Sequence, residues 1–156
     1  MKADTNPTLI LGSDHAGFSY KCELKSHLQS LGYGIDDVGT TDHQPVDYPD
    51  IAVALATKMQ TLEAVKGIII CGSGVGVCIA ANKYRGIRAG VCHDAYSAHQ
   101  GVEHDDMNVL CLGQRIVGIE LAKEIVGKFL EAQFSHAPRH QRRLEKILEI
   151  EKENLL

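Results

Sequence analysis

The chain has 156 residues, of which 44% are hydrophobic and 23% charged, proportions typical of one globular domain with its own core. Its formal net charge of -4 argues against a nucleic-acid-binding surface, so a basic cluster is better interpreted as a local anion site. We therefore expect a single domain over residues 1–156 that binds no nucleic acid.

The first residues and the cysteines indicate the compartment. Residues 1–7 are polar and lead into a strand, which predicts no signal peptide. The uncharged stretch 67–82 is too short and too rich in glycine for a membrane span. The five cysteines are odd in number and include no C-x-x-C pair, which favours free thiols. We expect a cytoplasmic protein without membrane contact.

Short apolar runs alternate with helical patterns along the chain. The runs predict strands at residues 9–12, 33–38, 67–71, 86–92 and 108–112. The patterns predict helices at residues 17–31, about 48–60, 75–83, from about 94, and about 118–132. This alternation, with its short loops, is typical of a five-stranded parallel sheet covered on both faces, a Rossmann-like three-layer α/β/α sandwich.

In such a sheet, ligands bind beyond the carboxyl ends of the strands. That rule brings Asp14, His15, Cys71, His93-Asp94 and Arg115 to one edge, because each follows or ends a predicted strand. The segment after the first strand lacks the G-x-G-x-x-G fingerprint, which argues against a nicotinamide cofactor.

The most informative segment is the glycine-rich loop that follows the third strand and begins at Cys71. Its glycines let backbone N–H groups crowd around an anion, and the positive end of the next helix favours the thiolate of Cys71. A base held beside an anionic substrate indicates catalysis. The alternative is a common strand–turn–helix junction in which Cys71 is simply a small core residue.

A last helix is predicted to start at Pro138. Arg139, Arg142 and Arg143 lie near its first turn, where the helix dipole prefers acids, so an anion is expected there. The helix also carries an apolar stripe, which needs either the chain's own core or a second subunit as its partner. The stripe consists of Leu144, Ile147, Leu148 and Leu155.

Several short motifs occur in a fixed order between about residues 9 and 150. They are Gly12-Ser13-Asp14-His15-Ala16-Gly17, Asp47-Tyr48-Pro49, Cys71-Gly72-Ser73-Gly74-Val75-Gly76, Ala80-Ala81-Asn82-Lys83, Gly86-Ile87-Arg88-Ala89, His104 with Asn108-Val109, Gly113-Gln114-Arg115, and Arg139-His140-Gln141-Arg142-Arg143. Together they resemble the type B ribose-5-phosphate isomerase family, which also holds the bacterial galactose-6-phosphate isomerase subunits.

The resemblance implies that aldose and ketose phosphates are interconverted through an enediolate, without a metal or other cofactor. It assigns proton transfer to Cys71, orientation of that cysteine to Asp47, and ring opening to His104. A thiolate and an imidazole both suit acid–base work near neutral pH. The plainer alternatives are an N-cap at Asp47 and a surface histidine at position 104.

The resemblance also implies a substrate site. The Ser73 hydroxyl and the backbone N–H groups of the loop would stabilise the enediolate, as preorganised donors do. The loop residues concerned are Gly72, Ser73, Gly74, Val75 and Gly76. Sugar and phosphate would be bound by Asp14, His15, Arg115, Arg139 and Arg143.

One segment departs from the family pattern. Many relatives have Ser-Arg-x-His-Asn where this chain has Gly101-Val102-Glu103-His104-Asp105. Asp105 can accept a hydrogen bond from a sugar hydroxyl, but its carboxylate would repel an enediolate or phosphate oxygen. Val102 removes a positive charge. Both changes bear on sugar preference more than on reaction class.

Three functions stay open at this point. The first is a ribose-5-phosphate isomerase of the non-oxidative pentose phosphate pathway. The second is an isomerase of allose or galactose 6-phosphate, and the third is a non-catalytic sugar-phosphate-binding module. Cys92, His93 and Cys111 could be imagined as zinc ligands, but no fourth ligand is evident and core packing suits the two cysteines better. We expect a homodimer or a tetramer in which the terminal helix takes part in dimerisation and the arginines of one chain reach the Cys71 pocket of another.

Overall fold

Parallel strands form the centre of the structure, a computed structural model that describes residues 8–62 and 65–155. Residues 1–7, which the sequence predicts to be a polar lead-in, lie outside the described residues. In the described part, five strands pair in the order β2-β1-β3-β5-β4, all parallel. The strands are β1 (Thr8–Ser13), β2 (Gly34–Asp37), β3 (Gly67–Cys71), β4 (Ala89–Val91) and β5 (Val109–Gly113). The predicted parallel sheet is confirmed.

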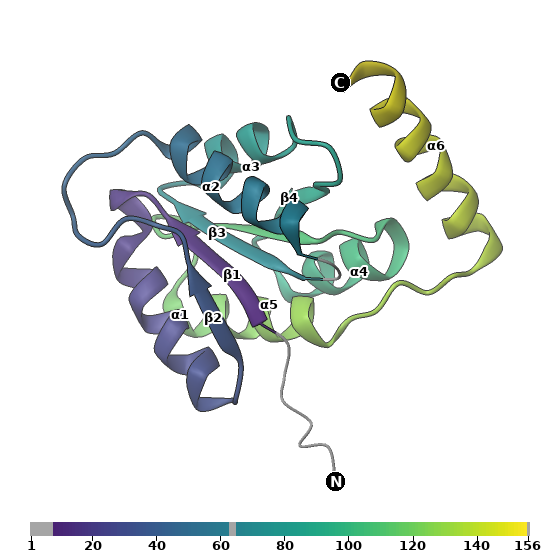
Figure 1. Cartoon of the computed structure of the whole chain (residues 1–156). Helices are drawn as coiled ribbons and strands as arrows, with labels where there is room; N and C mark the ends of the chain where they lie inside the picture. Colours follow the sequence, from purple (N-terminus) through teal and green to yellow (C-terminus); the bar gives the residue numbers. More distant parts are fainter. Residues whose placement is uncertain (1–7, 63–64, 156) are drawn as a thin grey trace, which may run out of the picture.

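Helices cover both faces of this sheet (Figure 1). They are the 3-10 helix η1 (His15–Gly17), α1 (Phe18–Ser30), α2 (Tyr48–Thr61), α3 (Val75–Ala81), α4 (Ala95–Asp105), α5 (Ile119–Glu131) and α6 (Pro138–Asn154). One core lies between the sheet and α1, α4 and α5, and the other lies between the sheet and α2 and α3. Because side chains alternate along a strand, Ile68 and Ile70 of β3 enter the first core while Ile69 and Cys71 enter the second. The expected three-layer sandwich is confirmed.

The fourth strand is shorter than the apolar run over residues 86–92 predicts. Side-chain amides take the place of strand pairing at its start. Asn108 donates to the Gly86 carbonyl and accepts from the Arg88 N–H, both at 2.8 Å. Asn82 accepts from the Ala89 N–H at 2.8 Å and donates to the Ala89 carbonyl at 2.9 Å. Asn82 also marks the end of α3, which stops at Ala81 rather than at residue 83.

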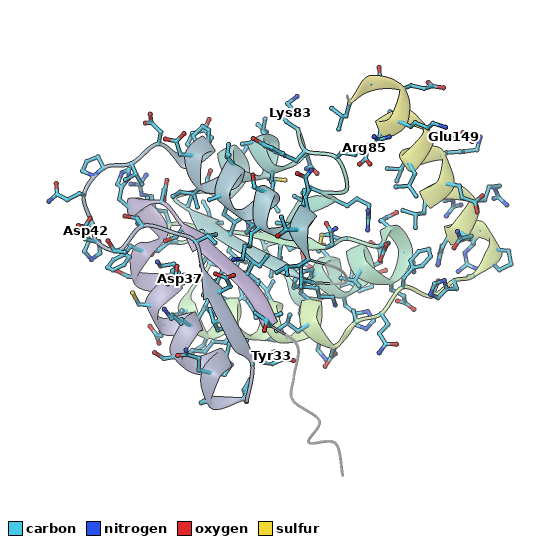
Figure 2. The ribbon with its side chains drawn as sticks, in the orientation of Figure 1. Tyr33, Asp37, Asp42, Lys83, Arg85 and Glu149 are labelled. Carbon is cyan, nitrogen blue, oxygen red and sulfur yellow. The ribbon has the colours of Figure 1, made fainter. Side chains whose placement is uncertain are left out.

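The loop between β2 and α2, residues 38–47, begins beside a largely buried ion pair. Lys21 Nζ lies 2.8 Å from Asp37 Oδ1 and also donates to the Thr40 carbonyl. Burial raises the pKa of Asp37, but hydrogen bonds from lysine ammonium groups outweigh it and lower the pKa. Figure 2 places Asp37 on β2 and Asp42 in the loop beyond it. The pair therefore fixes the start of this loop relative to α1.

Helix α6 stands apart from the layered body, beyond α4 (Figure 1). Its apolar stripe is divided: Leu144 is buried against the body, whereas Ile147 and Leu148 are exposed. Near the other end of the helix, Glu151 accepts a hydrogen bond from the Gly86 N–H at 3.0 Å. Between these anchors, a groove of about 540 Å³ separates α6 from β4. No helix in the described part of the chain combines the length and apolar composition that crossing a bilayer requires.

Candidate active site

A cleft of about 370 Å³ opens at the carboxyl ends of β1, β3 and β5. It is lined by Asp14, His15, Ala16, Tyr48, Cys71, Gly72, Ser73, Gly76, Arg115 and Ile116. A larger hollow of about 490 Å³, lined in part by Met59, Ile87 and Met107, has neither a thiol nor an imidazole among its described lining residues. The chemistry of the side chains, rather than the size of the hollow, therefore points to the cleft beside Cys71.

Cys71 ends β3 and is only 5% exposed. Its Sγ accepts a hydrogen bond from the Gly74 N–H at 3.1 Å. The loop achieves this contact by placing Gly74 at a φ of 81°, in the left-handed region that glycine adopts without strain. The structure thus fixes the Cys71 sulfur between the end of β3 and the glycine-rich loop, at the wall of the cleft.

Two N–H groups of the glycine-rich loop are already engaged within the loop. The Gly74 N–H binds Cys71, and the Val75 N–H donates to Ser73 Oγ at 3.2 Å. Gly72, Ser73 and Gly76 form the wall of the cleft. Gly76 lies in the first turn of α3, where backbone N–H groups have no partner within the helix. These three residues are the best placed of the loop to bind an oxyanion.

Arg115 lies over the same loop. Its N–H donates to the Gly72 carbonyl at 3.0 Å, and the neighbouring Gln114 N–H donates to the Cys71 carbonyl at 2.9 Å. A Cβ at position 72 would lie 3.0 Å from Arg115 Nη1, so the guanidinium packs on the glycine itself. The loop after β5 is therefore fastened to the loop after β3. This arrangement brings a permanent cation to the cleft.

Asp14 and His15 form the wall that follows β1. The Asp14 carboxylate is nearly buried and caps η1 by accepting from the Gly17 N–H at 3.1 Å. His15 Nδ1 accepts from the Val46 N–H at 3.2 Å, so the neutral ring carries its proton on Nε2. One ring nitrogen, Nδ1, thus holds the loop 38–47, and the other, Nε2, can donate a hydrogen bond to an anion.

Tyr48 is a lining residue that the sequence does not single out as a site residue. A Cβ at position 76 would lie 2.9 Å from its ring, so glycine at that position lets the tyrosine reach the cleft. The preceding residue, Asp47, occupies the N-cap position of α2, is exposed, and makes no capping hydrogen bond through its side chain. It does not line the cleft. The motif at 47–49 was the signal that this corner belongs to the site.

The remaining predicted residues lie elsewhere in the chain. His104 is in the last turn of α4, just before β5 begins, and therefore lies at the amino edge of the sheet, opposite Cys71. Its ring stacks on His140 of α6, with centroids 4.0 Å apart and planes at 27°. Figure 2 shows this separation: Asp42 labels the loop at the carboxyl edge of the sheet, and Glu149 labels α6 on the other side of the molecule. A single chain does not bring His104 to Cys71.

Asp105, Arg139 and Arg143 accompany His104 rather than Cys71. Arg139 and Arg143 are exposed on the first turns of α6, and Asp105 lines the groove between α6 and β4. Val102 is 2% exposed and belongs to the core. The valine that replaces the family's arginine therefore acts in packing within this chain.

The cysteines other than Cys71 are free thiols of the body, and Cys92 and Cys111 are buried. Across residues 8–62 and 65–155, no group of three or more histidine, cysteine or acidic side chains is arranged to hold a metal ion.

Comparisons with known proteins agree with this architecture. The sequence model of the Ribose/Galactose Isomerase family matches residues 9–147. The chain is 47% identical over 143 residues to Ribose-5-phosphate isomerase B of Escherichia coli, covering 92% of this chain and 95% of that one. It is 40% identical to a D-erythrulose-4-phosphate isomerase of Pectobacterium atrosepticum, covering 81% and 84%. A crystal structure of Ribose-5-phosphate Isomerase B from Mycoplasma genitalium with bound ribulose-5-phosphate superimposes with a TM-score of 0.89 at 39% identity, covering 95% and 98%.

Proposed function

Because the chain belongs to the Ribose/Galactose Isomerase family, we propose that it interconverts D-ribose 5-phosphate and D-ribulose 5-phosphate. The observation that carries the proposal is the surroundings of Cys71: an N–H on its sulfur, and Arg115 and His15 on the same cleft. The similarity to two enzymes named ribose-5-phosphate isomerase B supports the pentose as substrate, since one of them holds ribulose-5-phosphate.

In the proposed reaction, the Cys71 thiolate takes the proton from C2 of the open-chain aldose. The C2–H electron pair forms the C1–C2 double bond, and negative charge develops on the former aldehyde oxygen. The N–H groups at Gly72, Ser73 and Gly76 stabilise this enediolate. Return of the proton to C1, with transfer of the hydroxyl proton from O2 to O1, gives the ketose. His15 Nε2–H contributes a donor to the phosphate.

We further propose that a complete site forms between two copies of the chain. The cleft of one copy would receive His104, Arg139 and Arg143 of the other, because these residues lie at the opposite edge of the sheet in their own chain. Apolar surface beside the cleft supports such a contact. Val75 and Ile79, one turn apart on α3, are 49% and 59% exposed. Burying such side chains would favour association.

The alternatives concern the length of the sugar. A D-erythrulose-4-phosphate isomerase at 40% identity makes a tetrose phosphate a specific second candidate. Allose and galactose 6-phosphates are the hexose candidates that the family suggests. A non-catalytic binding module is the least favoured, because a pure binding site needs no thiol with an N–H on its sulfur.

A single set of assays distinguishes these functions. The purified protein is incubated with ribose 5-phosphate, allose 6-phosphate, galactose 6-phosphate and D-erythrulose 4-phosphate, and the isomer formed is measured. We expect the highest kcat/KM with ribose 5-phosphate. A higher value with another sugar would replace the pentose as the substrate. Binding of all four without turnover would instead identify a binding module.

A further inference from the structure

Within its own chain, His104 stacks on another histidine, and its Nε2 also lies 3.8 Å from Glu103 Oε2. The two rings stack at 4.0 Å with planes 27° apart, so one face of the His104 imidazole lies against His140. His104 keeps 30% of its side chain exposed, whereas His140 is only 3% exposed. The exposed ring is therefore free to meet a substrate while the buried ring supports it from behind.

A chain of hydrogen bonds fixes the position of the His140 ring. Its Nδ1 lies 2.6 Å from Ser135 Oγ. That hydroxyl accepts from the Ala137 N–H at 3.2 Å, which leaves its proton available to donate to Nδ1. The Ser135 N–H in turn donates to the carbonyl of Glu103 at 3.0 Å, in the same turn of α4 as His104. Through Ser135, these hydrogen bonds link the His140 ring to the turn of α4 that carries His104.

The surroundings of His140 also disfavour protonation of its ring. Burial lowers the pKa of His140, and the nearby His104, Arg139 and Arg143 lower it further, against an opposite effect of Glu103. A ring that resists protonation competes less with His104 for a proton.

Seating α6 on the body does not explain a histidine here. Leu144, one turn further along the same face, is an apolar side chain that is only 7% exposed. A buried imidazole needs a hydrogen-bond partner that a leucine would not, and Ser135 supplies one. The hydrogen bond between Ser135 and His140 is consistent with a functional role for the His104 ring, against which His140 is stacked.

We propose that His140 is a positioning residue, whose anchored ring holds the His104 imidazole in the orientation that opens the furanose ring of the substrate. This inference rests on the proposed function, in which His104 exchanges protons with the ring oxygen and the anomeric hydroxyl. His140 itself does not touch the reacting atoms.

Three variants separate the parts of this arrangement. His140→Phe keeps a flat ring against His104 but removes the hydrogen bond. His140→Asn keeps a polar group near Ser135 but removes the stack, and Ser135→Ala removes the anchor alone. Two readouts accompany them. The first is the rate from ribose 5-phosphate as enzyme concentration rises. The second is deuterium uptake at C1 of ribulose 5-phosphate in D₂O, which needs the enediolate chemistry but no ring opening because this ketose is open-chain.

An enzyme that cannot open the ring depends on spontaneous opening, so its rate from ribose 5-phosphate stops rising with enzyme concentration. We expect this plateau for His140→Asn, with ring opening lowered by about 10- to 100-fold, as for a misplaced catalytic group. Ser135→Ala and His140→Phe both remove the hydrogen bond but keep a ring against His104, so each should lose less than His140→Asn, about threefold to tenfold. Deuterium uptake should stay unchanged in all three.

Other outcomes overturn the inference. If ring opening is unaffected in His140→Asn and Ser135→Ala, the stack does not position His104. If deuterium uptake falls in parallel with ring opening, or if His140→Phe loses as much as His140→Asn, the role is structural or depends on another property of the ring. Should His140→Asn fail to fold, Ser135→Ala decides. Failure of the proposed function is recognised separately: the wild type would be inactive, or His104→Asn would show no plateau.

Discussion

Cys71 is the residue on which the proposed chemistry depends most directly, because it is the thiol at the cleft. We predict that Cys71→Ala lowers kcat by at least about a hundredfold, the low end for loss of an acid–base group. Deuterium uptake into ribulose 5-phosphate should fall equally, while phosphate binding persists. A variant that keeps more than a tenth of wild-type kcat would exclude Cys71 from this role.

His104 has a different task, so its loss should have a different signature. We predict that His104→Ala reaches a plateau in rate from ribose 5-phosphate as enzyme concentration rises, since the furanose must then open by itself. Conversion of the open-chain ketose should stay proportional to enzyme concentration. If both directions lose activity without such a plateau, His104 is not the ring-opening residue.

Cys78 is a half-buried free thiol that does not line the cleft. A hydrogen bond with Cys111 lowers the pKa of Cys78 to about 7, although burial opposes the shift, whereas burial raises the pKa of Cys92 to about 11. The thiolate of Cys78 therefore accumulates as pH rises through about 7. In a Cys71→Ala background, we expect iodoacetamide labelling of Cys78, measured by mass spectrometry, to increase over that range. Labelling that begins only near the ordinary thiol value of about 8.5 would contradict this.

Among the elements, the junction of α1, β2 and the loop 38–47 depends on the pair of Lys21 and Asp37. We predict that Asp37→Asn lowers the free energy of unfolding by about 3–5 kcal/mol, because it leaves a buried ammonium without its carboxylate. Asp36→Asn is the matched control. Its pair with Lys58 is only partly buried, with 44% of the Lys58 and 32% of the Asp36 side chain exposed, so the change should cost less than about 1 kcal/mol. Urea denaturation measures both.

The same pair makes a pH prediction with a definite sign. The pKa of Asp37 is lowered in the folded protein, so its contribution is complete at neutral pH and is lost as acid protonates the carboxylate, below about pH 4. The stability of Asp37→Asn should therefore approach that of the wild type in acid. A difference that is constant over pH 3–7 would mean that the effect is not electrostatic, with pH 3 lying below the ordinary aspartate value of about 3.9.

Strong local patterns made most elements predictable. β3 begins and ends where its apolar run and flanking glycines indicate. The strand predicted at residues 86–92 is too long because Ile87 is apolar and buried. The backbone near Ile87 forms hydrogen bonds with the side-chain amides of Asn82 and Asn108. Hydrophobicity predicts burial, but it does not reveal whether a side chain or a strand satisfies the backbone.

The candidate site was predictable only where the topology alone gathers residues. Cys71 and Arg115 meet because both follow strands of one parallel sheet. The position of His104 at the opposite edge follows from the direction of α4, which is known only once the helix is placed. Tyr48 and His140 are not predictable as site residues, because the place of Tyr48 depends on its ring packing against Gly76 and that of His140 on its stack with another ring.

For the whole molecule, the separation of the two groups makes a prediction about assembly. We predict that Cys71→Ala and Arg139→Ala chains, each inactive alone, regain activity when mixed, because one site of the hybrid dimer then contains both intact residues. Up to about a quarter of wild-type activity is expected if subunits exchange at random and each dimer has two sites. Failure of complementation, despite subunit exchange proven by mass spectrometry, would place the arginines in their own chain's site.

A chain truncated before Arg139 provides a second view of the same assembly. It lacks α6, and with it Leu144 and both predicted phosphate-binding arginines. Under the dimer proposal, association and phosphate affinity should be lost together. Analytical ultracentrifugation and phosphate titration measure the two losses, and a truncated chain that still dimerises would remove α6 from the interface.

The amide of Asn82 has a consequence for solubility. It occupies both the N–H and the carbonyl of Ala89, the first residue of the edge strand β4. An unprotected edge strand is a template on which another chain can add a strand, the usual route to β-aggregation. Here that edge is only three residues long, and its first backbone groups are already taken. At this edge, a second copy would therefore contact side chains rather than continue the sheet, which disfavours the growth of fibres from β4.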